Sequence, residues 1–324
     1  MQIFCYLCNF TLKFHLKTEM AENEEVYHIP ALLEDTVKGL NINPKGIYVD
    51  ATMGGCGHSR AILQQLTAPG HLYSFDQDMD AIERAISDPL FTPVHSNFRY
   101  ISNFMRFYGH RDDIDGILAD LGVSFHHFDD PGRGFSFRWE GPLDMRMNRK
   151  SQHDAAWLLN NLDEHKLADI FYLYGELKNA RKLASAIVKY RSTHTLTHVE
   201  HLLDMVRPMI NPRQEKKELA QIFQALRIAV NDEIEALREL LTQSVDLLKP
   251  GGRLVIITYH SLEDRLVKNF MKTGNLEGKQ EKDFYGRTLS PFRLLSSKPI
   301  VPTEEEVERN PRSRSAKLRI AEKI

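Results

Sequence analysis

The sequence predicts an α/β fold in which a mostly parallel sheet carries an inserted helical domain. Three short apolar runs, each ending in an aspartate, alternate with helical patterns at residues 47–50, 71–76 and 115–120. Strand–helix alternation with continuous apolar strands is typical of a parallel sheet covered on both faces. Residues from about 128 to 217 show only helical periodicity. We therefore expect this stretch to be inserted between two parts of the sheet domain.

The remaining elements follow from periodicity and from residues that end helices. Apolar residues recur at intervals of three or four between Leu226 and Leu248, which predicts one long amphipathic helix or a closely joined pair. The Pro-Gly-Gly segment at 250–252 ends this pattern. Thr197 and Glu200 have the spacing of a capping box. The other expected helices cover residues 58–66 and 80–86, and the later strands cover 253–259, 292–296 and 316–321.

The composition limits the class of protein. The chain has 324 residues and a formal net charge of −2, with 42% hydrophobic and 27% charged residues, as in ordinary globular proteins. No apolar run approaches the roughly 18–20 residues that span a bilayer, so we expect no contact with a membrane. Near-neutral charge excludes a charge-saturated nucleic-acid binder, so a nucleic-acid site must be a local basic patch. Two patches without acids occur, at 178–191 and 309–319.

The cysteines indicate the setting of the protein. Three cysteines are too few for a disulfide framework, which favours a reducing, cytoplasmic environment. Cys5 and Cys8 form a CxxC pair, but no second pair of ligands accompanies them, so we predict no metal site. We expect the tract that contains them to be an extension outside the fold. The predicted boundaries divide the chain into that extension at 1–19, the sheet domain at 20–127 and 218–324, and the helical domain at 128–217.

The most informative local motif is the glycine-rich turn at 50–59, which follows the first expected strand. Glycines let a ligand approach the backbone, and Asp76 at the end of the second strand can accept hydrogen bonds from two ribose hydroxyls. A nicotinamide dinucleotide would need a third glycine where the chain has Arg60. S-adenosylmethionine fits better, because it has a ribose, no pyrophosphate and a cationic sulfonium attracted to Asp50 or Asp120. A turn that binds no ligand is the alternative.

Further side chains are suited to a nucleic-acid substrate. Asp120 ends the third strand, where an acid either faces the cleft of a parallel sheet or only caps the following turn. Phe135, Phe137 and Trp139 alternate with glycine and arginine, so they either stack on bases or fill the core of a structured loop. His260 follows the late strand at the same edge of the sheet, without the motif of a serine hydrolase.

Taken in order, these motifs resemble those of one family, the RsmH (MraW) methyltransferases. The resemblance runs from about residue 27 to the C-terminus, and the eight motifs together are far more specific than any one of them. The matching segments are 28–30, 54–59, 120–124, 133–137, 142–146, 223–228, 260–265 and 310–315.

The resemblance implies a class I S-adenosylmethionine-dependent methyltransferase with an inserted helical substrate-binding domain. The implied reaction is methylation of the exocyclic N4 of a cytidine in 16S rRNA of the small ribosomal subunit. The chain departs from the family at Cys56, where glycine is usual, and at His127, which ends Phe-His-His where the family has Ser-x-Gln. The family's cofactor contacts carry over to Cys56, Gly57, His58, Asp76, Phe98, Asp120 and His127.

The implied transfer requires help for a weak nucleophile, because the lone pair of the cytidine amine is delocalised into the ring. An acceptor bonded to N4–H would localise that pair, and Asp120 and then His260 are the catalytic candidates. The target base must be unstacked to reach a buried methyl group, and Phe135, Phe137 or Trp139 could hold it there. Two other classes stay open: a methyltransferase of the same fold with another substrate, and a non-catalytic RNA-binding assembly factor. The oligomeric state is open as well.

Overall fold

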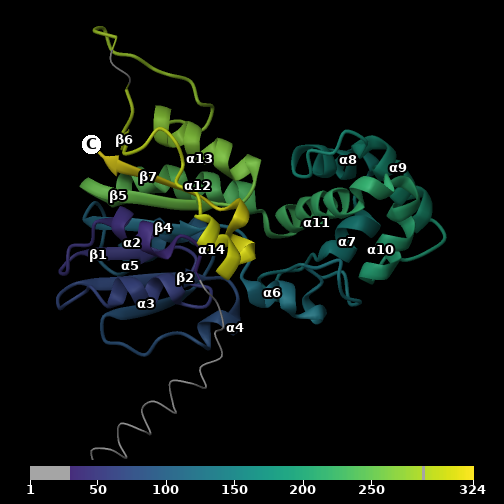
Figure 1. The fold of residues 1–324 in the computed structure, drawn as a ribbon, viewed down its shortest axis with the longest axis horizontal. Coiled ribbons are helices and arrows are strands. Elements are labelled where there is room, and N and C mark those ends of the chain that lie inside the picture. Colours follow the sequence, from purple (N-terminus) through teal and green to yellow (C-terminus); the bar gives the residue numbers. More distant parts are fainter. Residues whose placement is uncertain (1–29, 287–288) are drawn as a thin grey trace, which may run out of the picture. The chain divides into compact units, whose positions relative to one another are not determined.

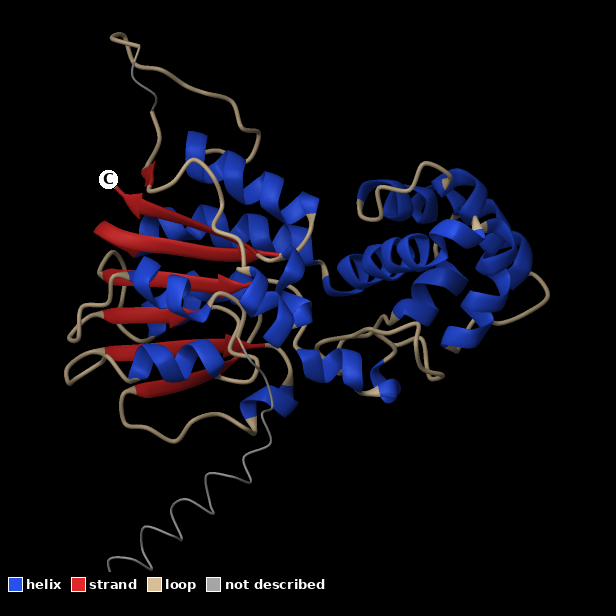
Figure 2. Ribbon diagram, in the orientation of Figure 1, coloured by secondary structure: helices blue, strands red, loops and turns tan. Residues whose placement is uncertain are grey.

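A single sheet organises the part of the chain that the computed structural model describes, residues 30–286 and 289–324. Its order is β3-β2-β1-β4-β5-β7-β6, and Figure 2 shows the strands side by side. The first five strands of this order run parallel, whereas β7 is antiparallel to both of its neighbours. The strands are β1 Ile47–Asp50, β2 His71–Asp76, β3 Phe91–His95, β4 Ile114–Asp120, β5 Leu248–Thr258, β6 Phe292–Leu294 and β7 Lys317–Lys323. The predicted extension at 1–19, with Cys5 and Cys8, and residues 28–29 of the first motif lie outside the described residues.

Helices precede or follow these strands in the α/β pattern that the sequence predicts (Figure 1). They are α2 Leu33–Leu40, α3 Gly57–Leu63, α4 Met79–Ile82, α5 Ile101–Phe107, α6 Phe125–Asp129, α12 Glu233–Leu247, α13 Ser261–Thr273 and α14 Glu304–Arg309. Helices α3 and α4 are shorter than the ranges 58–66 and 80–86 that periodicity predicts. Among the described residues, no helix combines the length and the apolar character needed to cross a membrane.

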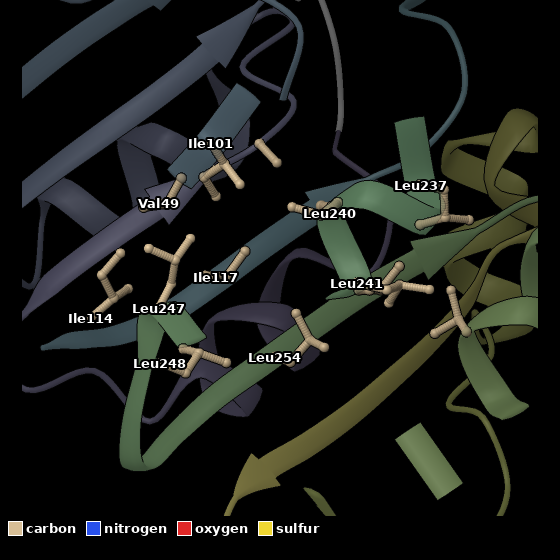
Figure 3. Close-up of a cluster of buried hydrophobic side chains, with 14 of the residues drawn as sticks. Val49, Ile101, Ile114, Ile117, Leu237, Leu240, Leu241, Leu247, Leu248 and Leu254 are labelled. Atoms are coloured by element: carbon tan, nitrogen blue, oxygen red, sulfur yellow. The ribbon is translucent and has the colours of Figure 1, made fainter. Parts of the chain in front are cut away.

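The sheet is buried on both faces. On β4, Ile117 and Ala119 belong to one hydrophobic cluster, whereas Leu118 between them belongs to another, because successive strand residues point to opposite faces. The first cluster packs against α5, α12 and α13, and Figure 3 shows Leu237 and Leu240 of α12 beside the strands. The second cluster packs against α2 and α3. Burial on both faces explains why these strands read as continuous apolar runs.

A third hydrophobic cluster lies among the helices of the middle of the chain. Figure 1 labels these helices α7 to α11. It includes Phe171, Ile187, Leu202 and Leu226, all buried. The amphipathic spacing that predicts these helices therefore reflects a core that is separate from those of the sheet. The boundaries at 128 and 217 stay predictions. The helices are α7 Ala155–Asn161, α8 Glu164–Leu173, α9 Ala180–Arg191, α10 Val199–Val206 and α11 Glu215–Asn231.

Three local features differ from the sequence analysis or extend it. The apolar stripe from Leu226 onward belongs to a closely joined pair of helices, because Asp232 between α11 and α12 has a left-handed backbone with φ of 52°. The predicted capping box is wrong: α10 has His198 at its N-cap, and no side chain caps it. Strand β3 was not predicted. It contains Pro93, which is tolerated because β3 is an edge strand of the sheet.

Candidate active site

The glycine-rich turn places polar groups at the carboxyl end of β1. Asp50, which ends β1, is buried; it accepts a hydrogen bond from the Ser59 hydroxyl at 2.6 Å and from the Thr52 amide at 3.1 Å. Burial raises the pKa of Asp50, and these hydrogen bonds counteract that rise. A Cβ at Gly54, where φ is +48°, would meet only a backbone oxygen at 3.9 Å. The turn therefore leaves open space beside its backbone, which is the property that a ligand cradle requires.

Asp76 ties this turn to the end of β2. Its Oδ2 accepts a hydrogen bond from the Gly54 amide at 2.9 Å, and its Oδ1 accepts one from the Asp78 amide at 2.8 Å. Burial raises the pKa of Asp76, while the two amides favour its charged form. Each carboxylate oxygen has two lone pairs, so one acceptor site per oxygen is left for a ligand. The predicted ribose partner thus lies directly beside the predicted glycine turn.

A pocket opens at this edge of the sheet, between the ends of the strands and the beginning of α12. Its walls combine the apolar side chains of Phe98 and Leu121 with the amides of Gln77 and Asn97. The amide of Asn97 donates to Gln77 Oε1 at 3.0 Å, so the two amides fix each other. The lining residues are Thr52, Gln77, Asn97, Phe98, Leu121, Gly122, Met147, Asn231, Glu233, Ala236, Leu237 and Glu263.

Asp120 stands at the end of β4, with a side chain that is 15% exposed. Its Oδ1 accepts a hydrogen bond from the Tyr259 hydroxyl at 2.8 Å, and its backbone amide donates to the Thr52 hydroxyl at 2.7 Å. Its Oδ2 lies 3.7 Å from Nδ1 of His58. Burial raises the pKa of Asp120 to about 6, although His58 and Tyr259 favour the charged form. This carboxyl group can therefore exchange a proton near neutral pH.

His260 lies beside two glutamates. His260, Glu233 and Glu263 each bring one potential ligand atom to within 4.8 Å of the others. Nε2 of His260 is 3.1 Å from Oε1 of Glu263, but neither ring nitrogen has a well-aligned hydrogen bond among the described residues. Arg227 donates to both oxygens of Glu233, at 2.9 and 3.0 Å. Because this guanidinium occupies Glu233, the group is a network of compensated charges rather than an open cation site.

A buried ion network follows β2. His127 places Nε2 2.6 Å from Oδ2 of Asp78 and Nδ1 3.0 Å from the Ser124 hydroxyl. Arg133, which is 1% exposed, donates to the same Asp78 oxygen at 2.9 Å. Burial would raise the pKa of Asp78, but His127 and Arg133 outweigh it and hold the pKa well below its usual range. Both ring nitrogens of His127 thus have partners within the protein, beside the predicted cofactor site.

The comparisons with known proteins agree with this arrangement. The family model described as the MraW methylase family matches residues 25–324. The chain belongs to the MraW methylase family. It is 60% identical over 305 residues to the ribosomal RNA small subunit methyltransferase H of Parabacteroides distasonis, with 94% of this chain and 100% of that protein covered. The protein of the same name from Phocaeicola vulgatus is 61% identical over 304 residues, with the same coverage.

Among solved structures, the chain is similar to a methyltransferase homologue from Pyrococcus horikoshii. The identity is 13% and the TM-score is 0.41, with 92% of this chain and 68% of that chain covered. Membership of the methylase family, together with the sheet order and its antiparallel β7, establishes the class I methyltransferase fold that the motifs imply.

The residue that departs from the family pattern at position 56 turns away from the pocket. Cys56 has a left-handed backbone with φ of 62° at the N-cap of α3, a conformation that glycine adopts most easily. Its side chain is 1% exposed and packs in the cluster with Ile62 and Met53. Burial raises the pKa of its thiol to about 11. The cysteine therefore keeps the turn without crowding the pocket.

The aromatic loop mainly fills the core. Phe135 is 4% exposed and packs on His127, with ring centroids 4.9 Å apart. Phe137 packs edge-on against Phe223 of α11, at 5.5 Å. Trp139 alone of the three predicted stacking residues is well exposed, at 52%. The core interpretation therefore describes the two phenylalanines, and only Trp139 is placed to meet a large substrate.

The two basic patches differ. In the patch at 178–191, Arg191 donates to the Leu159 carbonyl at 2.7 Å, while the other four side chains are exposed. In the patch at 309–319, Arg319 is buried and bonds to Asp264 at 2.7 Å. Lys317 reaches the same carboxylate at 3.4 Å. The second patch is thus largely neutralised within the protein, and the first is the stronger candidate for an RNA-facing surface.

Sequence reasoning missed the groups that hold the predicted residues in place. Tyr259 and Thr52 fix Asp120, and neither belongs to a residue type that stands out in a cleft motif. Asn97 follows β3 and was missed, because Pro93 within that strand argues against a strand in the sequence. Asn231 bonds to the Met147 amide at 2.8 Å and so connects the pocket to the end of α11. The position of Tyr259 at the end of the strand predicted at 253–259 was the one available signal.

Proposed function

We propose that this protein transfers a methyl group from S-adenosylmethionine to the exocyclic N4 of a cytidine in 16S rRNA of the small ribosomal subunit. The observation that carries the proposal is the pair of aspartates, Asp76 and Asp120, at the ends of β2 and β4, the strands on either side of β1 and its glycine turn. Relatives about 60% identical bear the name ribosomal RNA small subunit methyltransferase H, which supports the substrate. As a protein that acts on ribosomal RNA, it would work in the bacterial cytoplasm.

The described residues fit the donor. Phe98 and Leu121 offer apolar surface to an adenine, and the amides of Gln77 and Asn97 can meet its polar edge. Asp76 has acceptor sites for ribose hydroxyls, and Asp50 and Asp120 supply negative charge for a sulfonium. The family's remaining contacts map to Gly57, at the first turn of α3, and to His58, with His127 as the least direct.

In the proposed mechanism, S-adenosylmethionine supplies an electrophilic methyl group and leaves as S-adenosylhomocysteine. Asp120 accepts a hydrogen bond from N4–H and so directs the amine lone pair toward the methyl carbon. The sulfur–carbon bond breaks as the N4–C bond forms, and the electron pair of the broken bond stays on sulfur. The amine then carries a surplus proton, which passes to Asp120, whose pKa of about 6 suits this exchange. His260 is the second candidate for the acceptor.

The helical stretch at 128–217 is the proposed RNA-binding part of the protein. Its exposed cations on α9 supply attraction to phosphates, and Trp139 offers a face on which a base can stack. Replacement of Arg181 and Lys182 by glutamate should weaken RNA binding and lower its dependence on salt. Lys279→Glu with Lys282→Glu is the matched control, since these two side chains, which follow α13, are also exposed. Equal salt slopes for both pairs would exclude α9 from the RNA contact.

The experiment for the activity compares small subunits from cells with and without the gene by mass spectrometry of their rRNA nucleosides. We expect N4-methylated cytidine to disappear without the gene and to return when the purified protein and S-adenosylmethionine are added. Naked 16S rRNA and assembled subunits are tested side by side as acceptors. Asp120→Asn should transfer methyl groups about 10²–10⁴-fold more slowly than the parent protein. Unchanged nucleosides in the deletion strain would refute the proposed substrate.

A further inference from the structure

Tyr259 directly follows β5, and hydrogen bonds hold both its side chain and its backbone. Its hydroxyl donates to Oδ1 of Asp120 at 2.8 Å, and its backbone amide donates to Oε2 of Glu263 at 3.0 Å. Burial and the negative charge of Asp120 raise the pKa of the phenol well above its usual value. The phenol is therefore a permanent hydrogen-bond donor to this carboxylate.

The second oxygen of Asp120 is in a different situation. Oδ2 has no hydrogen bond among the described residues, and Nδ1 of His58 lies 3.7 Å from it. Nε2 of His58 lies 3.1 Å from the carbonyl oxygen of Ala31. Because a carbonyl can only accept, Nε2 of His58 donates to it, and Nδ1 at 3.7 Å lies beyond hydrogen-bond distance of Oδ2. His58 thus leaves this oxygen available to another donor.

We propose that Tyr259 is a positioning residue for Asp120: its hydroxyl occupies Oδ1, keeps the carboxylate ionised and leaves Oδ2 for the amine of the target base. The inference rests on the proposed function, because it assigns the free oxygen to N4–H. The tyrosine itself touches neither the donor nor the base.

The charges around Asp120 explain why this help is needed. His58 on α3 and the Tyr259 hydroxyl favour the ionised form, whereas Asp50 on β1 and Glu263 on α13 oppose it. Burial opposes it most strongly and already brings the pKa to about 6. Removal of the phenolic donor therefore raises the pKa further. At pH 7 a larger fraction of Asp120 is then protonated and cannot accept the N4–H hydrogen.

Tyr259→Phe removes only the hydroxyl group. We expect the rise of kcat with pH to move upward by about one pH unit, the amount that one charge-assisted hydrogen bond supports. The affinity for S-adenosylmethionine should stay within about twofold of the parent. Tyr73→Phe is the matched control, because Tyr73 of β2 is a buried tyrosine whose hydroxyl contacts His110 at 3.2 Å, outside the site. A loss of activity that is equal at every pH would indicate a structural role and overturn the proposal.

A second measurement does not depend on activity. The carboxyl carbon of Asp120 is titrated by NMR in protein labelled with ¹³C-aspartate, and Asp120→Asn identifies its signal. We expect a midpoint near pH 6 in the parent protein and in Tyr73→Phe, and a midpoint about one unit higher in Tyr259→Phe. An unmoved midpoint in Tyr259→Phe would refute the role of the tyrosine. Absence of methyl transfer by the parent protein would instead refute the proposed function.

Discussion

Two buried carboxylates at the same edge of the sheet have opposite electrostatic environments. Asp78, just after β2, is held by His127 and Arg133, and its pKa lies well below the usual range. Asp120, at the end of β4, has one side-chain donor, and burial raises its pKa to about 6. The positively charged partners His127 and Arg133 outweigh the effect of burial at Asp78, whereas the partners of Asp120 do not outweigh it.

The two environments suit different roles for the two carboxylates. Asp78 is permanently charged, and with Arg133 it connects the end of β2 to the backbone of Arg146 and Met147. Asp120 keeps one oxygen without a protein donor and titrates near neutral pH. A group that must exchange a proton needs the second environment, whereas a group that fixes loops around a pocket needs the first.

The largest expected effect concerns the buried ion network around Asp78. Arg133→Met removes the guanidinium and leaves Asp78 buried without its main counter-charge. We expect the free energy of unfolding in urea to fall by about 3–5 kcal/mol, as when one partner of a buried ion pair is deleted.

Arg149→Met is the control for this variant. Arg149 is 57% exposed and lies 3.8 Å from Asp80, so its loss should change stability by at most about 1 kcal/mol. Similar losses for the two arginines would mean that the buried network around Asp78 is no stronger than a surface ion pair.

The pH dependence of stability should have opposite signs at the two aspartates. The pKa of Asp78 is lowered on folding, so its stabilisation is present at neutral pH and is lost in acid. Asp78→Asn should therefore destabilise the protein by about 1.5–3 kcal/mol at pH 7 and by less as the pH falls. The pKa of Asp120 is raised to about 6, so ionisation of this group lowers the stability of the fold. This destabilisation is absent below about pH 4 and complete above about pH 7.

Asp120→Asn should accordingly make the protein more stable at pH 8 than the parent and change little at about pH 4. Urea unfolding of both variants at the two pH values provides the measurement. A loss of stability at pH 8 in Asp120→Asn would contradict the raised pKa and, with it, the contrast between the two carboxylates.

The smallest expected effect is on donor binding. Asp76→Ala should weaken the affinity for S-adenosylmethionine by about 10–100-fold in calorimetry, because hydrogen bonds to a charged acceptor are lost. Unfolding of the same variant, measured in parallel, corrects for the two amides that Asp76 also holds. An unchanged affinity would exclude Asp76 as the ribose partner.

The sequence predicted the parts of this site that depend on strand ends. Strands β1, β2 and β4 and the aspartates that end them follow from short apolar runs, because burial on both faces leaves little choice of residue. The ordered motifs then pointed to the family. The sequence did not predict Tyr259 as the donor to Asp120, since that bond joins residues 139 positions apart.

The loop at 132–139 shows the same limit from the other side. Arginines and aromatic residues in one segment suit RNA binding and core packing equally well. Only the fold shows that Arg133 is buried against Asp78 and that Phe135 is 4% exposed. Likewise, the cations at 309–319 form a patch without acids in the sequence, although Arg319 of β7 bonds to Asp264 of α13, 55 positions away. Such residues bind partners that are distant in the sequence, and the spacing of residues along the chain does not reveal those partners.

A crystal structure with S-adenosylhomocysteine and a cytidine-containing RNA fragment tests the central claim most directly. The account predicts that the adenosine of S-adenosylhomocysteine lies between the glycine turn and Phe98, with its ribose on Asp76. It predicts that N4 of the target cytidine lies within about 2.7–3.2 Å of Oδ2 of Asp120. An N4 bonded to another group, with Asp120 facing away from it, would contradict the account.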